Sequence, residues 1–145
     1  MKKLGILLAS ALVMGLSFTS CSSDDDSNDV GSIVGKWNFS TQKITTNGVT
    51  VNEGPYNGNE AGCSTDYIEL FENNTATTGD YDENCDLELI SSTYLRTGNV
   101  LNVTNGDISA VFDIVVANST TMVLKNTYNY EGAAFTTEVT YLKAQ

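Results

Sequence analysis

From Ile33 onward, short runs rich in β-branched and aromatic residues alternate with short polar segments. Asn, Gly and Asp separate these runs, and proline occurs once, at Pro55. No stretch of 33–145 repeats apolar residues at the i, i+3, i+4 spacing of an amphipathic helix. Asn47-Gly48 and Asn105-Gly106 are strong hairpin signals, because both central positions of a type I′ turn need a positive φ. The pattern therefore predicts an all-β fold.

The runs predict up to nine strands, connected as a meander. We expect them at 36–46, 49–52, 65–72, 74–81, 86–96, 100–104, 109–117, 120–130 and 134–143. Side chains alternate between the two faces of a strand, so Phe112, Ile114 and Val116 should share one face. Eight or nine meandering strands in a chain of this length indicate either a sandwich or a closed up-and-down barrel.

The N-terminus has the pattern of a secretory signal peptide over residues 1–20. Lys2 and Lys3 precede an apolar run, 4–16, that is too short to span a membrane and is followed by small residues. Residues 17–21 resemble the lipobox of bacterial lipoprotein precursors, which ends on the cysteine that is lipidated. The acidic run after Cys21 resembles the surface-export tether of Bacteroidetes and Flavobacteria lipoproteins. The alternative is an ordinary signal peptide cleaved at another small residue.

This resemblance implies an exported protein, held on the outer membrane at the cell surface by lipid on Cys21. Attached acyl chains bind membranes through their buried methylene groups, and two signals hold a protein more stably than one. The acidic tether also has a plain physical role, since like charges repel one another and keep a linker extended. The sequence thus divides into a signal peptide (1–20), a lipidated cysteine with its tether (21–32) and one domain (33–145).

Composition excludes several classes of function. The chain has 7 basic and 18 acidic residues and a net charge of −11. Loss of Lys2 and Lys3 with the signal peptide leaves 5 against 18, or −13. Such a charge disfavours binding to nucleic acid or to anionic lipid. Histidine is absent, which excludes Ser-His-Asp and Cys-His catalysis. We expect no enzyme activity and no cofactor.

Two cysteines remain once Cys21 is assigned to lipid. An exported pair such as Cys63 and Cys85 favours a disulfide. The alternatives are free thiols or half of a metal site, although a zinc site would lack ligands here. The acidic segment 80–88 places oxygen ligands at alternate positions, as a calcium loop does, but lacks its glycine and its final glutamate. We expect a solvated loop there and no metal site.

Gly35-Lys36-Trp37 resembles the Gly-x-Trp start of the first strand in lipocalins, and most closely the lipocalin-like domain of small Bacteroidetes lipoproteins. Further matching features follow in the same order as in that family. They are a cysteine before the strand 66–71, the turn 72–75, the second cysteine, Cys85, the hairpin 98–103 and the strand 121–124. The resemblance implies an eight-stranded antiparallel up-and-down barrel, either fully or incompletely closed. It also implies that Gly35 and Trp37 are structural residues at the barrel base.

A barrel of eight strands either fills with side chains or holds one small ligand. The candidate lining residues are Phe39, Ile68, Leu70, Phe112, Ile114, Phe135, Val139 and Tyr141. The alternative is that these residues form a packed core without a cavity. We therefore expect a barrel that binds a small hydrophobic ligand. The competing hypothesis is a non-enzymatic interaction or inhibitor module at the cell surface, which would use exposed tyrosines.

Overall fold

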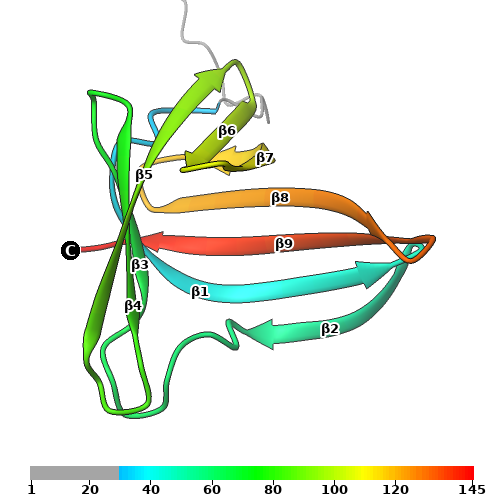
Figure 1. Cartoon of the computed structure of the whole chain (residues 1–145), viewed down its shortest axis with the longest axis horizontal. Coiled ribbons are helices and arrows are strands. Elements are labelled where there is room, and N and C mark those ends of the chain that lie inside the picture. Colours follow the sequence, from blue (N-terminus) through cyan, green and yellow to red (C-terminus); the bar gives the residue numbers. More distant parts are fainter. Residues whose placement is uncertain (1–29) are drawn as a thin grey trace, which may run out of the picture.

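The computed structural model describes residues 30–145, and this part of the chain is all-β (Figure 1). The predicted signal peptide (1–20), Cys21 and most of the predicted tether lie outside the described residues. All nine expected strands are present. They are β1 (Gly35–Thr46), β2 (Val49–Pro55), β3 (Tyr67–Leu70), β4 (Thr75–Tyr81), β5 (Leu87–Thr97), β6 (Val100–Asn105), β7 (Ile108–Ala117), β8 (Thr121–Tyr130) and β9 (Ala133–Lys143). Residues 30–145 contain no helix long and apolar enough to cross a membrane.

The strands form an antiparallel meander that closes on itself through pairing of β1 with β9. The ring consists of β1 and β3 to β9, which makes an eight-stranded barrel, and β2 pairs only with β1. In Figure 1, β8, β9, β1 and β2 run side by side, while β3, β4 and β5 cross them near the C-terminus. The expected barrel is confirmed, and the sandwich is excluded.

Two ladders cover only part of their strands. β1 pairs with β3 along Gly35–Asn38 and with β2 along Thr41–Thr46, on the same edge. β7 pairs with β8 only from Asp113 to Ala117. The hydrogen-bonded ring is thus continuous around the end that holds Trp37, which we call the closed end. Beyond it, β2, β1, β9 and β8 continue as a four-stranded extension.

Trp37 lies at the centre of the closed-end core. Its side chain is 1% exposed, and its indole Nε1 donates a hydrogen bond to the Ile33 carbonyl at 2.7 Å. The Lys143 ammonium lies 4.2 Å from the centre of the tryptophan ring and donates to the Val34 carbonyl. The other large, fully buried side chains are Leu70, Leu101 and Met122.

The N-terminal segment closes this end of the barrel. Gly31 donates its N–H to the Ala117 carbonyl at 2.8 Å. The Arg96 guanidinium donates to the carbonyls of Gly31 and Val30, both at 2.6 Å. Val30 and Gly31, which the sequence analysis assigned to the tether, are thus bonded to the barrel.

One of the two predicted type I′ turns has the expected backbone, and the other does not. Asn47 and Gly48 both have positive φ, 49° and 81°. Asn105 instead ends β6 and pairs with Ile108, so Gly106 and Asp107 form the turn. Only Gly106 has a positive φ, 58°, which fits the type II′ pattern. The predicted turn at Asn105-Gly106 was therefore wrong by one position. Gly106 supplies the positive φ that either turn type needs, so the sequence did not distinguish the two.

Candidate functional site

The barrel encloses a cavity of about 430 Å³ next to the closed-end core. This volume lies within the range of roughly 300–1,000 Å³ that is usual for small-molecule sites. Its surface is mainly apolar, and it is partly open to solvent. The lining residues are Phe39, Gln42, Tyr56, Asn57, Ile68, Thr78, Val103, Phe112, Leu124, Thr137, Val139 and Tyr141.

The cavity occupies one layer of side chains and the core occupies the layer below. On β3, Leu70 lies in the core only, while Ile68 borders both the core and the cavity. β6 repeats this arrangement with Leu101 and Val103. Inward side chains recur every second residue along a strand, so each strand contributes to both layers. The barrel is therefore filled with side chains at its closed end and hollow in the next layer toward the four-stranded extension.

Five of the eight candidate lining residues reach the cavity, namely Phe39, Ile68, Phe112, Val139 and Tyr141. Leu70 and Ile114 are 0% and 2% exposed and belong to the closed-end core instead. Phe135 lies further out, where its ring stacks on Tyr128 with centroids 5.5 Å apart. Alternation places a residue on a face, but it does not give its height along the barrel axis. A ligand-binding role for the five residues stays a prediction.

Gln42 lines the cavity but was not predicted from the sequence. The register between β1 and β9 shifts between Phe39 and Thr41, which is a β-bulge at Ser40. An extra residue in one strand reverses the facing of every residue after it. Strict alternation from Trp37 and Phe39 would turn Thr41 inward. The bulge turns Gln42 inward instead and leaves Thr41 exposed.

A second bulge, in β7, changes which residue is buried in the core. The register between β7 and β8 shifts between Ile114 and Val116. Ala117, rather than Val116, is therefore buried in the core, at 1% exposed. The prediction that Val116 shares a face with Phe112 and Ile114 was wrong for this reason.

The Gln42 amide lies in an unusual environment. The residue is 5% exposed, and its Nε2 finds no hydrogen-bond partner among residues 30–145. Leaving a buried polar group unpaired costs about 1–3 kcal/mol. Most buried polar atoms in folded proteins have a partner, which for this amide has to be a water molecule or another group beyond residues 30–145.

Three aromatic rings form one wall of the cavity. Phe39 stacks on Tyr56 with centroids 4.4 Å apart and meets Tyr141 at 4.7 Å. Burial raises the pKa of the Tyr141 phenol, and burial followed by the charges of Asp66 and Asp80 raises the pKa of Tyr56. Both phenols therefore stay neutral at physiological pH and present hydroxyl groups.

The segment between β2 and β3, residues 56–66, is attached to the barrel at the Ser40 bulge. Tyr56 donates its N–H to the Ser40 carbonyl at 2.9 Å. The Asn59 side chain donates to the Phe39 carbonyl at 3.0 Å, and its oxygen accepts from the Asp66 N–H at 3.0 Å. These bonds hold Tyr56 and Asn57 beside the cavity.

A disulfide joins the same segment to the turn between β4 and β5. The Cys63–Cys85 bond that the sequence favoured is present, with the two residues 22 positions apart. It closes a covalent loop that contains β3 and β4. The segment beside the cavity is thus tied to two different parts of the barrel.

Asp66 is a buried carboxylate at the base of this segment. It is 4% exposed, and its Oδ1 accepts the Tyr81 N–H at 2.8 Å. Burial raises the pKa of the Asp66 carboxyl. The Tyr81 hydrogen bond opposes that rise, and the neighbouring Asp80 adds to it. Asp66 also links the segment to two strands. Its side chain is bonded to Tyr81 of β4, and its backbone carbonyl accepts the N–H of Phe39 in β1 at 2.9 Å.

The acidic segment 80–88 forms a self-contained turn. The Asp82 carboxylate accepts the N–H groups of Asn84 and Asp86, both at 2.9 Å. These hydrogen bonds lower the pKa of Asp82. Within residues 30–145, no group of three or more metal-ligating side chains lies close enough together to hold an ion.

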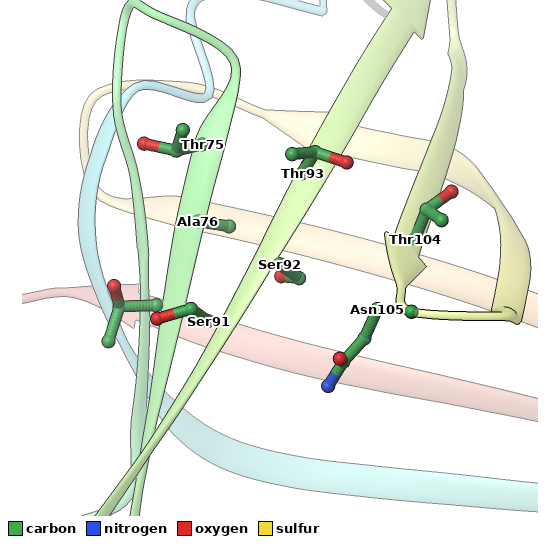
Figure 2. A pocket seen from close by; sticks show the side chains of 9 residues that line it. Thr75, Ala76, Ser91, Ser92, Thr93, Thr104 and Asn105 are labelled. Carbon is green, nitrogen blue, oxygen red and sulfur yellow. The ribbon is translucent and has the colours of Figure 1, made fainter.

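A second and more open hollow of about 550 Å³ lies over β4, β5 and β6. Figure 2 shows Thr75, Thr93 and Thr104 on three successive strands, with Asn105 at one end. Small hydroxyl side chains dominate its surface, and none of its lining residues is charged. Because ligand sites combine enclosure with apolar contact, the barrel cavity is the better candidate.

Comparison with known proteins agrees with this geometry. A family model described as the lipocalin-like domain matches residues 33–124. The chain belongs to the lipocalin-like domain family. This confirms the resemblance carried by the Gly35-Lys36-Trp37 motif. A comparison with curated protein sequences gave no match.

Solved structures share the fold of this lipocalin-like chain at low sequence identity. An uncharacterized protein from Bacteroides eggerthii has a TM-score of 0.52 at 12% identity, over 78% of this chain and 100% of its own. Lobster apocrustacyanin A1 has a TM-score of 0.50 at 13% identity, over 77% of this chain and 60% of its own. At these identities the likeness establishes the barrel fold alone.

Proposed function

We propose that this lipocalin-like protein binds a small hydrophobic molecule inside its barrel. The observation that carries the proposal is the cavity of about 430 Å³ above a filled core. Its wall combines three aromatic rings with aliphatic side chains, which would remove an apolar ligand from water. The few polar lining groups would then orient the ligand.

The cavity chemistry favours binding over catalysis. Its lining residues include no carboxylate, amine or thiol, and both tyrosine phenols remain protonated. Nucleophilic and general acid–base catalysis need a group whose pKa lies near the working pH. The lining offers hydroxyl and amide groups, which suit hydrogen bonding to a ligand.

The proposal is tested by filling the cavity from inside. The neutral fluorophore N-phenyl-1-naphthylamine should bind the purified chain and become brighter as it leaves water. Val139→Phe adds a ring within the cavity lining and should weaken binding at least about tenfold. Val111→Phe makes the same change on β7 at a residue that is 51% exposed, and binding should be unchanged.

Thermal unfolding of both variants would show that each still folds. If Val139→Phe fails to fold, Thr137→Leu fills the same cavity with a smaller change in volume. Equal fluorophore binding by the wild-type chain and a folded cavity-filling variant would contradict the proposal. That result would favour the competing function, an interaction or inhibitor module. The support for that module is the exposed Tyr128 and Tyr130 near the end of β8, at 48% and 62%.

We also propose that the protein is exported and anchored at the outer membrane by lipid on Cys21. The support is the order of Lys2, Lys3, the apolar run, the small residues and the cysteine. Val30 and Gly31, which are bonded to the barrel, follow the acidic run closely in the sequence. A short tether would then hold the cavity close to the membrane. Apolar molecules dissolve in that membrane, so the ligand would be nearby.

A further inference from the structure

We propose that the ligand is an uncharged apolar molecule carrying one polar oxygen, and that the Gln42 amide forms a hydrogen bond with that oxygen. This inference rests on the proposed function and adds the chemical class of the ligand. It assigns Gln42 as a specificity-determining residue.

The first observation is the unpaired amide. Gln42 lines the cavity, is 95% buried, and has an Nε2 without a partner among the described residues. The bulge at Ser40 is what turns this side chain inward. β-bulges often re-aim a side chain at a functional site. The terminal amide of glutamine rotates easily, so Gln42 is able to meet a ligand oxygen in the cavity.

The second observation is the charge around the cavity. No lysine or arginine is among its lining residues. The ionised groups that act on the lining residue Tyr56 are Asp66 and Asp80. A ligand carboxylate would lose its water, find no cation and face two negative charges. The cavity therefore disfavours fatty-acid anions.

The third observation concerns cations. Aromatic residues bind an ammonium group when it lies over the open face of a ring. Here the rings of Phe39 and Tyr56 stack on each other at 4.4 Å, and Tyr141 packs against Phe39 at 4.7 Å. The stack covers one face of Phe39 and one face of Tyr56, which reduces the aromatic surface that a cation would use. An uncharged ligand needs neither a cation to pair with an acid group nor an open ring face to bind an ammonium group.

The test compares three ligands of one chain length that differ only in the head group. 1-Dodecanol, dodecanoate and dodecylammonium would each displace N-phenyl-1-naphthylamine from the wild-type chain at about pH 8, where the acid and the amine are both charged. We expect dodecanol to displace the fluorophore at a concentration at least about tenfold lower than dodecanoate.

The Gln42→Leu variant removes the amide while keeping the volume similar. It should fold, because it replaces an unpaired polar group by an apolar one. We expect dodecanol to bind about five- to tenfold more weakly and the fluorophore to keep its affinity. Thr41→Leu, next to Gln42 but exposed, is the matched control and should change neither.

The outcomes separate the two proposals. If the fluorophore does not bind the wild-type chain, the proposed function fails. If the fluorophore binds but dodecanoate or dodecylammonium competes as well as dodecanol, the uncharged class is wrong and the barrel site stands. If Gln42→Leu leaves dodecanol binding unchanged, the role of Gln42 is overturned.

Discussion

At the scale of single residues, the barrel depends on a few polar groups placed among apolar ones. Trp37 illustrates a satisfied group, since its indole N–H is buried and bonded to the Ile33 carbonyl. Gln42 illustrates the opposite case, a buried amide without a partner. The first stabilises the closed end, whereas the second costs stability where a ligand would bind. This contrast between neighbouring layers is typical of a site that gives up some stability for function.

Asp66 gives a prediction at this scale. Burial raises its pKa above the ordinary value of 3.8, so the folded state favours the protonated acid. The stability that this acid contributes is present below about pH 3.8 and is lost as the pH rises through the folded-state pKa. Asp66→Asn keeps an oxygen for the Tyr81 N–H without the charge. The variant should gain stability relative to wild type between about pH 3.5 and pH 7.

Urea unfolding of both proteins at the two pH values measures this difference. Asp107→Asn, at an exposed turn, provides the control for a change in net charge. A stability difference between wild type and Asp66→Asn that does not change with pH would contradict the assignment.

At the scale of elements, two bulges and one covalent bond shape the interior of the barrel and the segment beside it. The Ser40 bulge in β1 both turns Gln42 inward and offers its carbonyl to Tyr56. The segment 56–66 then crosses back to β3, fixed by Asn59 and by the disulfide. The sequence predicted the cysteine pair from composition. It did not indicate that the pair holds the segment beside a cavity.

The disulfide supplies the second prediction. Loss of a crosslink that closes a loop of 22 residues should lower the free energy of unfolding by about 3 kcal/mol. The Cys63→Ser, Cys85→Ser double variant should therefore unfold at a lower denaturant concentration. It should also bind the fluorophore more weakly, since Tyr56 and Asn57 lie on the released segment.

Reduction of the wild-type chain provides an independent check and should reproduce the behaviour of the double variant. Equal stability of the oxidised and reduced proteins would show that the hydrogen bonds of Asn59 suffice to fix the segment.

At the scale of the whole molecule, charge and topology have separate roles. Pairing of β1 with β9 closes the meander and removes two sheet edges that would otherwise be free to pair with other chains. We expect the net charge of −11 to disfavour binding to nucleic acid and to anionic lipid. A domain with this charge needs a separate membrane anchor, and we propose that lipid attached to Cys21 provides it.

Lipid attachment is tested by metabolic labelling in a bacterial host with an alkyne-tagged fatty acid. The wild-type precursor should incorporate the label and sediment with membranes. Cys21→Ala should lose both properties, because the acyl chains that bind the membrane would be absent. The Cys63→Ala, Cys85→Ala double variant keeps Cys21 and should retain the label. Labelling of Cys21→Ala would overturn the assignment.

The sequence by itself determined the β-class, the positions of the nine strands, the Asn47-Gly48 turn and the cysteine pair. These features depend on local composition and on the two-residue alternation of strands, which are visible without the fold. The tertiary structure decided the height of each side chain along the barrel and the two reversals of facing. A bulge such as that at Ser40 depends on how β1 meets β9, a strand far away in the sequence, so β1 alone carries no signal for it. The unknown height explains why Leu70 was predicted at the cavity and lies in the core, and the bulge explains why Gln42 was not predicted and lies in the cavity wall.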